Sequence, residues 1–150
     1  MIGINLYKAS PYLLEKINTI CSLLRQGKKQ YEQVATTIKD KDLRRTMLSL
    51  AQESNQYACE LSSQIHTLGG TPEIEIINDA VMEDEIKNVN GETEIMILCE
   101  RNEKKMMSAY REILNESFLY EGLRKMIRYQ LNEMLCAFMQ VKQIGYLKFH

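Results

Sequence analysis

Hydrophobic residues recur along most of the chain at steps of three, four and seven, the spacing that lines one face of an α-helix. The first series comprises residues 13, 17, 20, 24, 31, 35 and 38. Three further series of this kind begin at Leu43, Ile95 and Leu123. No segment has the alternating pattern of a half-buried strand. The pattern predicts four helices, over about residues 11–39, 42–69, 92–116 and 119–147.

Residues that favour helix ends stand near these boundaries. Ser10 can cap the first helix, and Pro11 suits its first position because proline lacks the N–H that would be unsatisfied there. The second series stops at Gly69-Gly70. A glycine can adopt the left-handed conformation that ends a helix, and Pro72 then prevents its continuation.

The lengths of the connections constrain the topology. The junctions near 39–42 and 115–120 are short, so each should join two antiparallel helices into a hairpin. The connector at 70–91 is long enough to cross the bundle, and a short helix is expected within it at 80–89. A long crossover between two helical hairpins is the ferritin-like arrangement. The sequence therefore predicts a single all-α domain, residues 1–150, folded as a ferritin-like four-helix bundle.

Composition narrows the choice of partners and location. The chain has 150 residues, of which 45% are hydrophobic and 26% charged, as in an ordinary globular domain. A net charge of −1, with Asp40 and Asp42 interleaved among the basic residues of 39–45, predicts no nucleic-acid binding. No apolar run approaches the ~18–20 residues of a membrane span, and the first residues do not resemble a signal peptide. A cytoplasmic protein with no membrane contact is therefore expected.

A di-metal centre is the chemistry most often built into such a bundle. It requires inward carboxylates from all four helices and a Glu-x-x-His motif on two of them. The chain has only two histidines, His66 and His150, and neither stands in that motif. One glutamate per helix lies at the flank of an apolar stripe, and these are Glu32, Glu53, Glu103 and Glu133. The sequence therefore predicts no catalytic, cofactor-binding or metal-binding residue, and no cofactor.

Polar residues interrupt each apolar stripe once. Helix periodicity places four of them inward, at Lys28, Ser54, Asn102 and Gln130. A hydrogen-bonded core cluster that fixes the register of the helices is the favoured interpretation. A ligand pocket is the alternative.

The four cysteines, one in each helix, give no sign of a shared site. They have none of the close spacing of metal or redox motifs, so free thiols are expected. Cys21 and Cys99 fall on or beside the apolar faces, whereas Cys59 and Cys136 fall well away from them. The four side chains therefore cannot converge on one metal ion.

Two helices have unusually few charges on their outer faces. Glu53 and Glu60 are the only charged residues from 46 to 72, and Glu133 and Lys142 the only ones from 129 to 147. Depletion of charge marks the centres of protein interfaces. We therefore expect the second or fourth helix to be covered by a second subunit, giving a homodimer, by another protein or by the connector. A neutral face in contact with water is the alternative.

Two segments carry a resemblance to a known family, LAQESNQYACELSSQIHTLGGTPE (50–73) and ILCERNEKKMMSAYREIL (97–114). They resemble an uncharacterised bacterial family of ferritin-like four-helix bundles, a domain of unknown function whose second helix ends in a Leu-Gly-Gly-x-Pro-Glu turn. Gly27 followed by Tyr31 also fits the first helix of that family. The likeness covers about residues 12–142. It implies a ferritin-like bundle, but no established activity, substrate or metal.

The chain departs from this family at two positions. Members often carry one histidine late in the second helix and another in the fourth. The matching positions here are Tyr57 and Phe138, both on the apolar stripes. Metal binding is therefore less expected of this chain than of other members.

Together these features favour a binding or structural module without a di-metal centre. They leave enzymatic activity open and favour its absence. One alternative is a metal-binding carboxylate protein that handles oxidants or metals. Another is a stress-linked module that binds a protein through the second and fourth helices.

Overall fold

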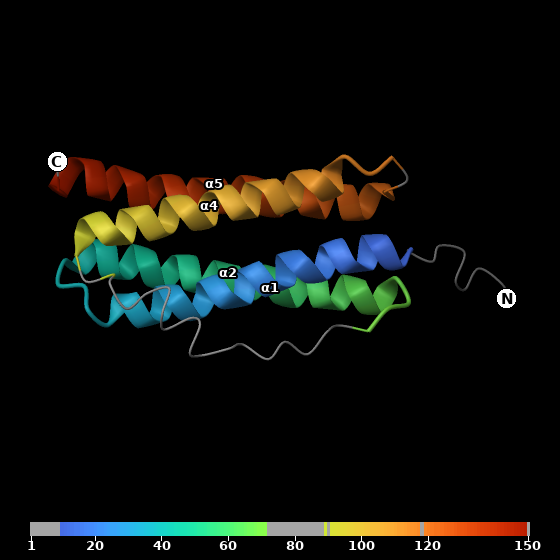
Figure 1. The fold of residues 1–150 in the computed structure, drawn as a ribbon, viewed down its shortest axis with the longest axis horizontal. Coiled ribbons are helices and arrows are strands. Elements are labelled where there is room, and N and C mark those ends of the chain that lie inside the picture. The colour runs from blue at the N-terminus through green and yellow to red at the C-terminus, as the bar shows by residue number, and fades with distance from the viewer. Residues whose placement is uncertain (1–9, 72–88, 90, 118, 150) are drawn as a thin grey trace, which may run out of the picture.

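The computed structural model describes residues 10–71, 89, 91–117 and 119–149 (Figure 1). Within this part of the chain there are four helices and no strand. They are α1 (Pro11–Ala35), α2 (Lys41–Thr67), α4 (Glu92–Leu114) and α5 (Glu121–Phe149). These helices confirm the four predicted from the hydrophobic pattern, with ends shifted by a few residues. The short helix expected at 80–89, and most of the connector around it, lie outside the described residues.

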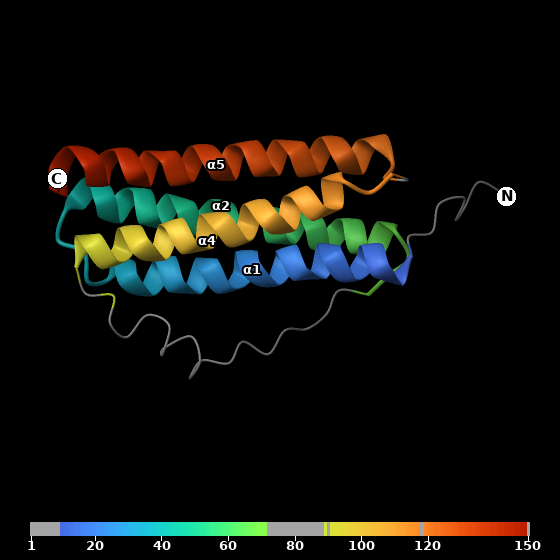
Figure 2. The same ribbon diagram turned by 45° about the horizontal axis from the view of Figure 1, so that its top comes forward.

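The four helices pack side by side in a closed ring. α1 contacts α2, α2 contacts α5, α5 contacts α4, and α4 contacts α1. Figures 1 and 2 show that α1 and α5 run in one direction and that α2 and α4 run in the other, so each helix is antiparallel to both of its neighbours. The arrangement is that of a four-helix bundle. It places α2 beside α5 on one side, with α1 and α4 on the opposite side.

Local hydrogen bonds explain where the helices of the first hairpin begin. The Ser10 hydroxyl accepts from the Leu13 N–H at 3.1 Å, and Pro11 occupies the first turn, as predicted. At the start of α2, the Asp40 carboxylate accepts from the Leu43 N–H at 2.9 Å. Both capping side chains satisfy an N–H that has no partner within its helix.

The glycine pair after α2 ends that helix. Gly69 has a φ of 85°, the left-handed conformation expected of a glycine at this position. The Gly69 N–H donates to the His66 carbonyl at 3.0 Å, and the Gly70 N–H donates to the Ile65 carbonyl at 2.9 Å. These two bonds form a Schellman motif, which satisfies carbonyls at the end of the helix.

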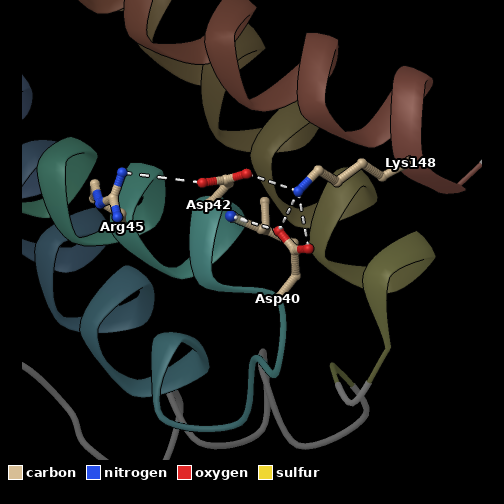
Figure 3. A network of polar contacts seen from close by, with 5 residues as sticks. Asp40, Asp42, Arg45 and Lys148 are labelled. Carbon is tan, nitrogen blue, oxygen red and sulfur yellow. Dashed lines mark hydrogen bonds and ion pairs between the residues drawn. The ribbon is translucent and has the colours of Figure 1, made fainter.

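A small ionic network ties the α1–α2 junction to the last turn of α5 (Figure 3). The Lys148 ammonium donates to Asp40 at 3.1 Å and to Asp42 at 2.8 Å, and Arg45 lies 3.9 Å from the other oxygen of Asp42. The bond from the Leu43 N–H, and then that from Lys148, hold the pKa of Asp40 below its usual value. The carboxylates of this junction therefore lie among the neighbouring basic side chains, as their interleaving in the sequence indicates.

Candidate functional site

A first group of buried polar side chains joins α1 to α4. The Asn102 side-chain amide donates to the side-chain oxygen (Oε1) of Gln30 and to the Tyr31 hydroxyl, both at 3.0 Å. Burial raises the pKa of Tyr31 far above its usual value, so the hydroxyl remains neutral. The prediction for α1 was wrong, because the buried polar residues of this helix are Asn18 and Gln30. Lys28 is only half buried, and its ammonium pairs with Glu32 at 3.1 Å along the helix surface.

A second group joins α2, α4 and α5 around Gln130, which is fully buried. Its side-chain oxygen accepts from the Tyr110 hydroxyl at 2.9 Å. Its amide donates to Glu60 at 3.0 Å and to the Tyr57 carbonyl at 3.4 Å. We call these contacts the Gln130 network. Ser54 is also buried, but its hydroxyl donates to the Leu50 carbonyl of its own helix at 2.8 Å.

The predicted inward positions of Ser54, Asn102 and Gln130 are therefore confirmed, yet they do not form one cluster. Each of the three side chains belongs to a separate set of hydrogen bonds, and each is hydrogen-bonded to polar groups nearby. Such satisfied groups fix the register of packed helices. Sequence periodicity identified the inward residues but could not show which of them meet.

The four flanking glutamates do not converge. Glu32 is exposed beside Lys28, whereas Glu103 is buried between α4 and α5 and pairs with Lys142. Glu103 was expected at the flank of the apolar stripe of its helix but is buried, and the neighbouring lysine compensates its charge. Among the residues that the structure describes, no three His, Cys, Asp or Glu side chains gather in a way that could hold a metal ion.

The other two glutamates, Glu53 on α2 and Glu133 on α5, interact electrostatically. Burial, and then the charge of Glu133, raise the pKa of Glu53 above its usual value. One carboxylate oxygen of Glu53 is buried without a hydrogen-bond partner among the described residues. The rings of Tyr57 and Tyr129 pack edge to face, with their centroids 6.4 Å apart. Glu60 also belongs to the contact between α2 and α5, since it accepts from Gln130. We define the acidic seam as Glu53, Tyr57, Glu60, Tyr129 and Glu133.

Replacing Glu53 by glutamine is expected to raise the free energy of unfolding at pH 7 by a few tenths to about 1 kcal/mol, since water screens this partly exposed group. A raised pKa means that the folded protein binds the Glu53 proton more tightly than the unfolded chain does. Wild-type stability therefore falls as pH rises above the ordinary value of 4.5, and the fall ends beyond the raised pKa. Glu53→Gln removes this part of the pH dependence.

Chemical denaturation of both proteins between about pH 4 and pH 8 measures the effect. Glu112→Gln is the matched control, because Glu112 is exposed on α4. The control should keep the wild-type dependence on pH. An unchanged dependence in Glu53→Gln would contradict the expected repulsion between Glu53 and Glu133.

From residue 46 onward the outer face of α2 exposes no charged side chain, as the sequence indicates, whereas the start of the helix exposes Lys41, Asp42, Arg44 and Arg45. The exposed polar residues of the uncharged part include Ser49, Gln52, Asn55, Gln56, Cys59, Ser63 and His66. Ser62 is half buried and accepts from Arg25 at 2.6 Å. On α5, Tyr129, Cys136 and Gln140 are exposed, in keeping with the low charge of this face in the sequence. Because α2 and α5 are neighbours, the two uncharged faces lie on the same side of the bundle.

The cysteines follow the prediction made from helix periodicity. Cys21 and Cys99 are buried, Cys59 and Cys136 are exposed, and all four are free thiols. Burial raises the pKa of Cys99 to about 12, so this thiol remains protonated. The two exposed thiols lie on the outer faces of α2 and α5.

Besides Tyr129, the outer face of α5 carries three large exposed hydrophobic side chains that the sequence reasoning missed, those of Met139, Tyr146 and Leu147. Tyr129, Met139, Tyr146 and Leu147 are 56%, 57%, 70% and 79% exposed. Other described side chains of this kind, Tyr12, Leu48 and Ile97, are distributed over the other three helices. An apolar residue that lies off the core-facing stripe of its helix is the sequence signal that would have identified Met139 and Tyr146.

A comparison with models of protein families gives a match over residues 13–116, to a domain of unknown function, DUF2383. The chain belongs to this family. The match covers α1, α2 and α4 and ends just after α4, so α5 lies beyond it. This match confirms the resemblance to a family of unknown function.

Further comparisons with curated proteins and with solved structures found no match. Among the described helices of this DUF2383 chain, none combines the length and the apolar character that a membrane crossing requires. The function of the chain must therefore be inferred from its own surface and interior.

Proposed function

We propose that this DUF2383 chain is a cytoplasmic, ferritin-like four-helix bundle that acts as a non-enzymatic binding or structural module. Its docking surface would be the side formed by α2 and α5. The directions of the helices support the ferritin-like assignment, because α1 and α2 are antiparallel, α4 and α5 are antiparallel, and α2 and α4 are parallel (Figure 2).

The observation that carries the proposal is the position of the two uncharged faces on neighbouring helices. Docking removes water from the covered surface, and removing it from charged groups costs more than removing it from neutral amides and hydroxyls. Between 46 and 67, α2 exposes no charged side chain, and between 129 and 147, α5 exposes only Lys142, although both helices expose charged residues nearer their ends. The opposite side is less suitable. On α4, exposed charged residues follow most of the helix, and they include Glu100, Lys104, Lys105, Arg111 and Glu112. A protein partner is therefore expected to cover α2 and α5.

Photo-crosslinking in living cells tests the proposal. A photoreactive amino acid at Gln52 on α2, or at Gln140 on α5, should give covalent adducts with protein. The same amino acid at Lys104 on α4 is the matched control, because all three positions are exposed. The expected result is adducts from the first two positions at several times the yield of the control. Equal yields at all three positions, or adducts from Lys104 alone, would overturn the proposal.

One observation favours a second candidate, a metal-binding carboxylate protein. A buried oxygen of Glu53 has no hydrogen-bond partner among the described residues, and the Glu133 carboxylate lies nearby. Two carboxylates are a minimal ligand pair for a divalent cation. Metal analysis of protein from supplemented cultures separates the two candidates. Stoichiometric iron or manganese that is lost in Glu53→Ala would favour the metal-binding function.

A further inference from the structure

The outer face of α5 carries a regular stripe of exposed residues. Its members stand at steps of three and four, the spacing of the contact positions in a coiled coil. They are Tyr129, Asn132, Cys136, Met139, Gln143 and Tyr146. We call this set the α5 stripe. It bears no charge, and part of it borders a shallow, mostly apolar hollow of about 540 Å³.

The α5 stripe has nearly the same chemistry when read from either end. An aromatic ring, an amide and a sulfur atom are followed by a sulfur atom, an amide and an aromatic ring. In a dimer with a two-fold axis, a residue i of one chain that contacts residue j of the other implies a second contact, between j of the first chain and i of the second. The interface must therefore be complementary to itself. A stripe that matches its own reversed copy meets this condition.

We propose that two copies of the chain pair through α5 in antiparallel orientation, with the two-fold axis between Cys136 and Met139. This inference rests on the proposed docking function and names a second copy of the chain as the partner. Tyr129 then lies opposite the partner's Tyr146, Asn132 opposite the partner's Gln143, and Cys136 opposite the partner's Met139.

Charge favours the antiparallel orientation over the parallel one. Lys125 continues the stripe by one step toward the start of α5 and is exposed. In a parallel pair two Lys125 ammonium groups would face each other, and like charges in apposition are unfavourable. In the antiparallel pair they are separated by about 25 residues, or about 37 Å along the helix. Antiparallel helix dipoles also attract one another.

The amides select the register within the antiparallel orientation. Asn132 and the partner's Gln143 can satisfy each other, because each amide has both a donor and an acceptor. In a register shifted by one helical turn, each amide would face a sulfur or aromatic side chain instead. A buried amide without a partner costs about 1–3 kcal/mol, which is how a single polar residue fixes the register of a coiled coil.

The exposed area is sufficient for a specific dimer. Tyr129 and Tyr146 are 56% and 70% exposed, and two copies contribute four such rings. At about 150–250 Å² for each buried ring, the tyrosines alone would bury roughly 500 Å². Met139, Leu147 and the amides from both copies bring the total toward the ~1,000 Å² that a biological interface requires.

Crosslinking of purified full-length protein tests the pairing directly. The background is Cys59→Ser with Cys136→Ser, which leaves only the buried thiols of Cys21 and Cys99. Asn132→Cys and Gln143→Cys are made separately in this background and then mixed with a short bismaleimide. The mixture should give a covalent heterodimer in at least tenfold higher yield than either variant alone. In a dimer of two copies of the same variant, the two introduced thiols lie about 16 Å apart along the interface between the α5 helices.

Ser49→Cys on the exposed face of α2 is the matched control and should remain uncrosslinked. Crosslinking of Asn132→Cys to itself would indicate a parallel pair and overturn the orientation. No crosslink from any combination, together with a monomer in sedimentation, would overturn the dimer. A monomer whose α5 stripe is protected from labelling would show that the chain covers this face itself.

A charged substitution gives an independent measure. Tyr146→Lys should raise the dissociation constant of the dimer at least tenfold in sedimentation equilibrium. Ile97→Lys is the control, because Ile97 is 61% exposed on α4 and lies outside the stripe. Equal effects of the two substitutions would overturn the assignment to α5. If the purified protein is monomeric while Gln140 still crosslinks to other proteins in cells, the docking function stands and self-pairing fails.

Discussion

We expect Gln130→Leu to lower the free energy of unfolding by about 2–3 kcal/mol. Leucine nearly fills the volume of glutamine but cannot accept from the Tyr110 hydroxyl or donate to Glu60. Tyr110 is fully buried, and this burial raises the pKa of its hydroxyl far above the usual value. A buried hydroxyl without a partner carries its full desolvation cost. Denaturant unfolding followed by circular dichroism measures the loss.

A double substitution shows that the loss comes from the hydrogen bond and not from packing. Tyr110→Phe removes the hydroxyl, so Tyr110→Phe with Gln130→Leu should lose less than the sum of the two single losses, by about 1 kcal/mol or more. Gln140→Leu, on the exposed face of the same helix, is the control and should change stability by less than about 0.5 kcal/mol. Additive losses in the double variant would contradict the role of the Gln130 network.

Gly27→Val should lower the free energy of unfolding by about 3 kcal/mol. A Cβ atom at Gly27 would lie 3.0 Å from a ring carbon of Tyr31 and 3.2 Å from its hydroxyl oxygen. The ring cannot withdraw, because it is fully buried, packs edge to face on Phe138 at 6.3 Å and accepts from Asn102. Valine adds two further carbons at this contact and is held in few rotamers. Thermal and denaturant unfolding measure the loss.

Gly145→Ala is the matched control for this effect in another helix. A Cβ there would lie only 2.5 Å from the Met96 sulfur, a closer contact than any at Gly27. Met96 is a flexible side chain at the edge of the core and can move aside. The helix propensity of alanine exceeds that of glycine by about 1 kcal/mol, so this substitution should be neutral or stabilising. Equal losses at the two glycines would show that Tyr31 is as mobile as Met96.

The helices were predictable because their pattern is local. Apolar spacing located all four, and Ser10 and Gly69 behaved as capping residues of their types do. The error at Lys28 also has a physical reason. The buried stripe of α1 includes Gly27, Gln30 and Tyr31. Lys28 is next to Gly27 in the sequence and therefore lies close to the edge of this stripe. At the edge of a stripe, the type of side chain determines whether the residue is buried. A lysine there extends its ammonium group to water, whereas a glutamine is buried.

The hydrophobic patterns of the separate helices could not show which helices are neighbours in the bundle. Each pattern defines a core-facing side, but only packing shows that α2 lies beside α5. That neighbourhood joins the two uncharged faces and brings Glu53 close to Glu133. It also separates Asn102 from Gln130, which the sequence had grouped together. The candidate docking side is therefore a property of the assembled ring.

The ionic network around Lys148 has a consequence for the order in which the protein assembles during synthesis. Asp40 and Lys148 are separated by 108 positions, so the N-terminal hairpin leaves the ribosome long before its lysine partner is made. Until then, the partners of the two aspartates at the start of α2 lie within the first hairpin, the Leu43 N–H for Asp40 and Arg45 for Asp42. Domains fold progressively as they emerge. The contact between Lys148 and Asp40 therefore forms only after α5 has packed against α2, the step that completes the four-helix ring.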